Sequence, residues 1–174
     1  MRVIAGEFRS RRLKSIPGVA TRPTPDRLRE TLFDILQTRM EGAAFVDAYA
    51  GTGAVGIEAL SRGARHAFFL ERNSAALDAI RENLAALKLE PRSTVLAGPV
   101  LLTLPKCHAG LVFLDPPYEQ EREYAAALEL LSQAPPELTV VQHSVRLGLG
   151  ESYGELKRMR VVKQGDNALS FYGE

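Results

Sequence analysis

One segment sets the architecture of this chain: Phe45-Val-Asp-Ala-Tyr-Ala-Gly-Thr-Gly-Ala-Val-Gly-Ile-Glu-Ala-Leu-Ser-Arg-Gly63. Within it, Gly51, Gly53 and Gly56 satisfy the pattern G-x-G-x-x-G between a predicted strand and a predicted helix. Glycines at these positions let the backbone turn sharply and approach a ligand without a Cβ in the way. The segment therefore predicts an α/β fold in which this loop binds a nucleoside-containing cofactor.

Strand-like and helical patterns alternate on either side of the loop. We expect strands at residues 44–49, 66–71, 94–96, 111–114 and 138–142, and helices at residues 54–62, 75–87 and 121–132. Strands that alternate with helices pair in parallel through right-handed crossovers. The pattern predicts a Rossmann-like, mostly parallel sheet with helices on both faces.

The C-terminal part departs from this alternation. Residues 156–163 and 168–172 are two strand-like runs, and the four residues between them, Gln164-Gly165-Asp166-Asn167, have the composition of a hairpin turn. We expect the sheet to finish with an antiparallel C-terminal hairpin.

Positive charge is concentrated at the N-terminus. The 174 residues include 22 Lys plus Arg and 21 Asp plus Glu, so the net charge is +1; residues 1–22 carry +5 and the rest therefore carry −4. We expect residues 1–22 to form a basic N-terminal β-hairpin appendage, paired over about residues 2–13, and residues 23–174 to form a single domain. The candidate RNA-binding residues are Arg9, Arg11, Arg12, Lys14 and Arg22.

A helix is expected to follow this segment. Thr24, Pro25 and Asp26 have the order of an N-cap, a proline at the first helical position and an early acid, and the apolar spacing continues to about Thr38. This pattern predicts that the Thr24 side chain caps the helix.

Composition excludes several other classes of protein. The hydrophobic fraction is 45%, which is enough for a folded core and excludes a disordered chain. The single cysteine, Cys107, cannot form an internal disulfide, and no signal peptide or long apolar run is present. We expect a soluble cytoplasmic protein, without a metal site because the histidines lack metal-ligand spacing.

Two carboxylates flank the glycine loop in sequence. Glu71 ends the next predicted strand, 20 residues after Gly51, where a carboxylate can accept hydrogen bonds from ribose hydroxyls. Asp47 precedes the loop and would face a cationic amino acid group but repel a pyrophosphate, which favours S-adenosylmethionine over a dinucleotide. Asp47 could also simply organise the loop through its amides. The candidate cofactor-binding residues are Asp47, Gly51, Thr52, Gly53, Glu71 and Arg72.

A second motif follows the predicted strand at residues 111–114. Asp115-Pro116-Pro117-Tyr118 combines a carboxylate, a stiff turn with outward carbonyls and an aromatic face. These groups suit the exocyclic amine of a nucleobase, because the amine donates two protons and its ring can stack on an aromatic side chain. We predict that Asp115, Pro116, Pro117 and Tyr118 form the catalytic motif and orient the amine toward an electrophilic methyl group.

The two motifs together resemble a known family. The glycine loop resembles that of the class I S-adenosylmethionine-dependent methyltransferases, and Asp115 to Tyr118 resembles the signature of enzymes that methylate adenine-N6 or guanine-N2. The basic segment, the sequence from Arg22 to Phe33 and the sequence from Gly165 to Tyr172 are similar to the RsmD family, whose bacterial members methylate guanine-N2 of 16S ribosomal RNA.

This resemblance implies the activity, the cofactor and the partner. The chain would transfer a methyl group from S-adenosyl-L-methionine to the N2 amine of a guanine in 16S rRNA, free or within the small ribosomal subunit. Separately from the resemblance, nothing in the sequence demands a dimer, so we expect a monomer. Two positions depart from the family pattern: the chain near Gly98 lacks the acidic residue that contacts adenine, and Gln142 replaces a common Glu.

Other functions stay open on the sequence alone. A DNA adenine-N6 methyltransferase shares the site chemistry but usually needs a further target-reading domain. An NAD-dependent oxidoreductase is disfavoured by Asp47 and by the lack of a hydride-transfer acid. A noncatalytic RNA-binding protein with a vestigial site would keep the basic segment without activity.

Overall fold

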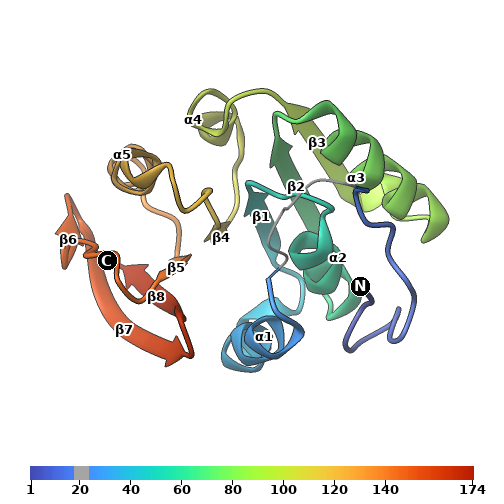
Figure 1. The fold of residues 1–174 in the computed structure, drawn as a ribbon, viewed down its shortest axis with the longest axis horizontal. Coiled ribbons are helices and arrows are strands. Elements are labelled where there is room, and N and C mark those ends of the chain that lie inside the picture. Colours follow the sequence, from blue (N-terminus) through green and yellow to red (C-terminus); the bar gives the residue numbers. More distant parts are fainter. Residues whose placement is uncertain (18–23) are drawn as a thin grey trace.

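A single mixed sheet forms the centre of the computed structural model, which describes residues 1–17 and 24–174. Its eight strands have the order β3-β2-β1-β4-β5-β8-β7-β6 (Figure 1). The strands are β1 (Ala44–Ala48), β2 (His66–Glu71), β3 (Ser93–Ala97), β4 (Leu111–Leu114), β5 (Leu138–Ser144), β6 (Ser152–Tyr153), β7 (Leu156–Gln164) and β8 (Asn167–Gly173). Strands β1 to β5 pair in parallel and β6 to β8 pair antiparallel, so the Rossmann-like sheet and its C-terminal hairpin are confirmed.

Helices cover both faces of this sheet. One apolar core lies between the sheet and α1 (Asp26–Met40), α2 (Ala54–Ser61) and α3 (Ser74–Ala86). A second core lies on the other face, beneath α4 (Val100–Thr103) and α5 (Glu121–Leu131). Two short 3-10 helices, η1 (Glu90–Arg92) and η2 (Leu104–Lys106), precede strands β3 and β4.

Alternation along the strands assigns their residues to these two faces. On β1, Phe45 belongs to the core on the α1 side and Val46 to the core on the α5 side. Asp47 therefore points toward the α1 side, as does Phe113, its register partner on β4. Side chains on this same face that lie at or just after the ends of the parallel strands therefore come together at the carboxyl edge of the sheet.

The structure corrects several details of the sequence prediction. Helix α1 begins at Asp26 without a side-chain cap, because the Thr24 hydroxyl is directed to Asp115 instead. Strand β5 continues past Gln142 to Ser144. Strand β6 and helix α4 are too short to show a period in the sequence and were not predicted.

The N-terminal segment, residues 1–17, folds back on itself over residues 1–13 as a short, irregular hairpin. One antiparallel bridge joins Arg2 to Arg12, and backbone hydrogen bonds from Val3 N to Arg11 O at 2.9 Å and from Leu13 N to Met1 O at 3.0 Å continue the pairing, although no regular strands form. Val3 and Leu13 are buried in the core on the α1 side, so the segment packs onto the domain.

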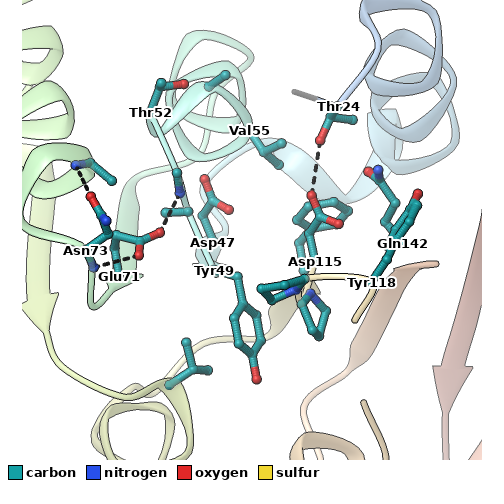
Figure 2. A pocket seen from close by; sticks show the side chains of 18 of the residues that line it. Thr24, Asp47, Tyr49, Thr52, Val55, Glu71, Asn73, Asp115, Tyr118 and Gln142 are labelled. Atoms are coloured by element: carbon teal, nitrogen blue, oxygen red, sulfur yellow. Dashed lines mark hydrogen bonds between the residues drawn. The ribbon is translucent and has the colours of Figure 1, made fainter. Parts of the chain in front are cut away.

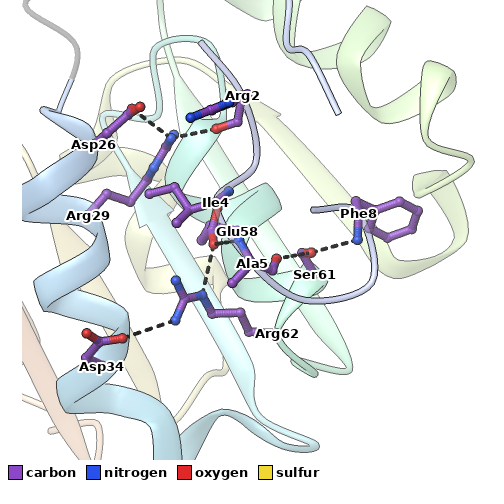
Figure 3. Close-up of polar contacts among 10 residues, drawn as sticks. All are labelled: Arg2, Ile4, Ala5, Phe8, Asp26, Arg29, Asp34, Glu58, Ser61 and Arg62. Atoms are coloured by element: carbon purple, nitrogen blue, oxygen red, sulfur yellow. Dashed lines mark hydrogen bonds and ion pairs between the residues drawn. The ribbon is translucent and has the colours of Figure 1, made fainter. Parts of the chain in front are cut away.

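Two side chains of helix α2, Glu58 and Ser61, hold the N-terminal segment in place through hydrogen bonds to its backbone. The buried Glu58 carboxylate accepts the backbone N–H groups of Ile4 at 2.8 Å and Ala5 at 3.0 Å (Figure 3). Ser61 donates to Ala5 O at 2.6 Å and accepts from Phe8 N at 2.9 Å. These contacts hold the segment beside the glycine loop, where Met1 and Ile16 reach the wall of a cavity.

None of the helices within residues 1–17 and 24–174 combines the length and the apolar character that a membrane span requires.

Candidate active site

A cavity of about 590 Å³ opens at the carboxyl edge of the parallel strands. Figure 2 shows Asp47, Glu71 and Asp115, from the ends of β1, β2 and β4, around the same space. Parallel strands of an α/β sheet bring their carboxyl ends to one edge, which is where such folds bind ligands. The two motifs that the sequence singles out therefore meet in one site.

Asp47 is almost fully buried on β1 and lies on the cavity wall. Its Oδ2 accepts the Gly56 N–H at 2.8 Å, so it organises the first turn of α2. Burial raises the pKa of Asp47 well above its usual range, the Gly56 N–H lowers it, and the charges of Asp115 and Glu71 raise it further. A cationic group in the cavity would oppose this rise by favouring the ionised carboxylate.

Glu71 closes the other side of the glycine loop. Its Oε2 accepts the Gly51 N–H at 2.9 Å, and its Oε1 accepts the N–H groups of Arg72 at 2.8 Å and Asn73 at 2.9 Å. The carboxylate therefore has a structural role in joining the ends of β1 and β2. Each carboxylate oxygen can accept more than one hydrogen bond, so Glu71 can also accept a ribose hydroxyl.

The glycines of the loop serve different purposes. Gly53 has φ of +81° and starts α2, but it does not line the cavity, and a Cβ there would meet Phe69 and Ile80 at 3.3 Å. A Cβ on Gly56 would lie 2.4 Å from Phe69 Cε1, which no small shift relieves. These two glycines permit helix α2 to pack on β2, and the other predicted cofactor residues line the cavity.

Tyr49 is a site residue that the sequence analysis missed. It has a left-handed φ of +62°, which costs a non-glycine residue about 1 kcal/mol or more. Its hydroxyl donates to Glu123 Oε2 of α5 at 2.6 Å, and burial raises its pKa, so the hydroxyl remains a donor. This hydrogen bond connects the end of β1 with α5, and both residues line the cavity.

The wall near Gly98 is apolar. Pro99 and Val100, which follow β3 and begin α4, line the cavity where the family pattern places an adenine contact. No acidic side chain comes from this segment, as the sequence indicates.

Asp115 follows β4 directly and faces the opposite half of the cavity. Burial raises the pKa of Asp115 to about 7, while a hydrogen bond from the Thr24 hydroxyl, 3.4 Å from Oδ2, lowers it. A carboxyl group with this pKa exchanges a proton readily near neutral pH.

The two prolines and Tyr118 line the same half of the cavity. The Pro116 carbonyl does not point outward as predicted, because it accepts a hydrogen bond from the buried Tyr124 hydroxyl at 2.9 Å. The Tyr118 hydroxyl donates to Asn167 Oδ1 at the start of β8. Both contacts fix the Asp-Pro-Pro-Tyr turn against neighbouring elements.

Gln142 on β5 also reaches this half of the cavity, near Tyr118 in Figure 2. Its side chain is buried, and its Oε1 has no hydrogen-bond partner among the residues that the structure describes. Thr24, Gln142 and Asn167 were not predicted as site residues. They come from distant parts of the chain, and only Gln142 stood out in the sequence, as a departure from the family pattern.

The basic residues of the N-terminal segment are exposed. Lys14 forms an ion pair with Glu82, and Arg11 donates to Ala86 O at 3.5 Å. Within the described part of the chain, the side chains of Arg9 and Arg12 make no hydrogen bond or ion pair. Arg22 lies outside the described residues.

Several proteins are similar to this chain over much of its length. YlbH of Bacillus subtilis is 34% identical over 181 residues, covering 99% of this chain and 98% of that protein. Ribosomal RNA small subunit methyltransferase D of Escherichia coli is 37% identical over 121 residues, covering 69% of this chain and 61% of that protein. The matched region therefore spans less than two thirds of the Escherichia coli methyltransferase.

Solved structures share the whole fold. YhhF of Escherichia coli superposes with a TM-score of 0.85 at 32% identity, covering 99% of this chain and 96% of that chain. A Thermus thermophilus protein superposes with a TM-score of 0.82 at 32% identity, covering 100% and 99%.

The family model described as conserved hypothetical protein 95 matches residues 1–173, which includes the glycine loop, the Asp-Pro-Pro-Tyr turn and the N-terminal segment. The chain therefore belongs to the conserved hypothetical protein 95 family, the RsmD family that its motifs resemble.

Proposed function

We propose that this protein is an S-adenosylmethionine-dependent methyltransferase that methylates the exocyclic N2 amine of a guanine in small-subunit ribosomal RNA. One observation carries the proposal: Asp47 and Asp115 lie at the ends of the adjacent strands β1 and β4 and line one cavity. This arrangement supports a site in which one carboxylate would face the cofactor and its neighbour would bind the acceptor amine.

The charge of the cavity wall suits a cationic cofactor. Among the described residues that line it, five are acidic and one is basic: Asp47, Glu71, Asp115, Glu119 and Glu123 against Arg72. This wall would repel a dinucleotide pyrophosphate but attract the ammonium and sulfonium charges of S-adenosylmethionine. The cavity volume of about 590 Å³ lies within the range of small-molecule sites.

The described residues divide into groups that would hold different parts of the cofactor. Asp47 and the Gly51 loop would hold its amino acid part, Glu71 its ribose, and Pro99 with Val100 its adenine. When bound, S-adenosylmethionine supplies an electrophilic methyl group on a positively charged sulfur.

Asp115 would act on the acceptor amine. Its carboxylate accepts one N–H of the exocyclic amine, which opposes the delocalisation of the nitrogen lone pair and orients it. When the new N–C bond has formed, the nitrogen must lose one proton, and a carboxylate of pKa about 7 can accept it. Tyr118, fixed by Asn167, would stack on the base.

The N-terminal segment would bind the RNA backbone. Arg12 is exposed near Met1, which lines the cavity, Arg9 is exposed near the C-terminal end of α2, and Arg11 and Lys14 are exposed but contact α3. When exposed arginines bind the phosphates of a nucleic acid, they release the counterions that were condensed on it. Arg22 would extend this surface.

The names of the relatives support ribosomal RNA as the substrate. Proteins named ribosomal RNA small subunit methyltransferase D, from Haemophilus influenzae and Escherichia coli, are 36% and 37% identical to this chain. The guanine-N2 atom follows from the family resemblance of the Asp-Pro-Pro-Tyr turn and the N-terminal segment.

Nucleoside mass spectrometry tests this function. Small-subunit particles, free 16S rRNA and duplex DNA, all from a strain that lacks the enzyme, are incubated with the protein and S-adenosylmethionine. N2-methylguanosine in one of the RNA substrates supports the proposal. Only N6-methyladenine in DNA, or no methylated nucleoside at all, would contradict it.

A further inference from the structure

Gln142 is a buried polar side chain in the half of the cavity that Asp115 lines, and its Oε1 lacks a hydrogen-bond partner among the described residues. The residue is 3% exposed. An unsatisfied buried acceptor is energetically costly, and native proteins keep few of them. A ligand that donates a hydrogen bond at this point would remove the cost.

The strand register places Gln142 beside Asp115. Leu114, the last residue of β4, pairs with Val141 on β5, and the next residues in the chain are Asp115, directly after β4, and Gln142, on β5. Neighbouring strands lie about 4.8 Å apart, so two side chains from adjacent strands can contact one edge of a single base. Figure 2 shows both side chains at the same end of the cavity.

The edge of guanine that carries N2 matches two acceptors. Its exocyclic amine is adjacent to the N1–H group, so the two donors lie side by side on one edge. Adenine presents an acceptor at N1, and its lone pair would face Gln142 Oε1. We infer that Gln142 accepts the N1–H of the target guanine while Asp115 accepts the N2 amine, so that Gln142 determines the choice of base. This inference rests on the proposed function.

A neutral acceptor also suits the charge of the cavity. Asp47 and Asp115 already lie in this cavity, and a third carboxylate at residue 142 would raise their pKa values further by like-charge repulsion. An amide supplies an acceptor without this effect. Gln142 can therefore accept a hydrogen bond from the base while the pKa of Asp115 stays at about 7.

The test separates base reading from a structural role by changing the substrate. The modified guanine is mapped first and then replaced by 2-aminopurine, which keeps the N2 amine but has an acceptor at N1. Single-turnover rates at subsaturating enzyme are measured on both RNAs for the wild type, for Gln142→Met, which removes the acceptor at similar volume, and for Gln142→Glu, which keeps it.

The inference predicts a distinct pattern. The wild type should methylate guanine about 10- to 100-fold faster than 2-aminopurine, and Gln142→Met should lose this difference by slowing only the guanine reaction. Gln142→Glu should recover the preference for guanine, with its pH profile shifted upward. The unchanged 2-aminopurine rate would show that the Met variant is folded.

Other outcomes overturn the inference. An equal loss on both substrates in Gln142→Met would assign Gln142 a structural role, and an unchanged preference would show that it does not read N1. Both results leave the proposed function intact, because they require a wild type that methylates guanine. A wild type that methylates neither RNA would instead refute the proposed function.

Discussion

Thr24 and Asp115 are separated by 91 residues in sequence and joined by a hydrogen bond of 3.4 Å from Thr24 Oγ1 to Asp115 Oδ2. The bond connects the start of α1 with the end of β4. It lowers the pKa of Asp115, which burial raises to about 7. A residue next to the N-terminal segment therefore influences the protonation of the proposed proton acceptor.

Replacing Thr24 with Val should shift the pH dependence of methyl transfer upward by about half a unit, because the ionised form of Asp115 loses a donor. Rates are measured from pH 5.5 to 9 with RNA and cofactor saturating. Thr31→Val is the matched control, since the Thr31 hydroxyl donates to Arg27 O within α1. Identical profiles for Thr24→Val and the wild type would contradict a direct effect on Asp115.

Asp115→Asn should make stability less dependent on pH. The folded-state pKa of Asp115, about 7, exceeds its ordinary value of about 3.9, so the folded state binds more protons between these values. Its contribution to stability is therefore present at low pH and lost as pH rises toward 7. The fall in unfolding free energy between pH 5 and pH 8 should shrink by about 1 to 3 kcal/mol in the variant. Urea denaturation at both values checks this, and parallel curves for the two proteins would contradict it.

Asp47→Asn should weaken S-adenosylmethionine binding by about tenfold or more, because a buried carboxylate no longer faces the cationic group. Burial holds the pKa of Asp47 well above its usual range, so binding of a cation to the wild type should release protons. Calorimetry in two buffers of different ionisation enthalpy measures both effects. Asp78→Asn, an exposed acid on α3, is the control. Equal affinity and proton release in Asp47→Asn would show that Asp47 only organises the loop.

The convergence of these carboxylates could be predicted because it follows from topology. Asp47, Glu71 and Asp115 each end an apolar run, and parallel strands bring such ends to one edge. The alternation of strands with helices supplied that topology directly from the sequence.

The remaining site residues depend on contacts between distant segments. Thr24 has the local sequence of an N-cap, yet its hydroxyl bonds to Asp115, so a tertiary contact replaced the local one. The inward Pro116 carbonyl depends on Tyr124, eight residues later on α5. Within the described residues, Gln142 Oε1 lacks a partner because of what its neighbours on β4 and β8 provide, and no periodicity identifies these neighbours.

Replacing Arg9, Arg11 and Arg12 with Ala should weaken RNA binding and reduce its salt dependence. Each lost phosphate contact removes up to about one unit from the slope of log affinity against log salt. Arg39→Ala is the control, because Arg39 is exposed at the end of α1 just before β1, at the opposite edge of the sheet from the cavity. An unchanged slope in the triple variant would mean that the segment does not contact phosphates.

The most direct test of the two-part site compares binding and methyl transfer in Asp115→Ala. The affinities for S-adenosylmethionine and for RNA are measured by calorimetry, and N2-methylguanosine is quantified by mass spectrometry after incubation with small-subunit RNA substrates. The account predicts cofactor and RNA affinities within about twofold of the wild type, together with a loss of methyl transfer of at least about a hundredfold. Full methyl transfer by Asp115→Ala would contradict the proposed site.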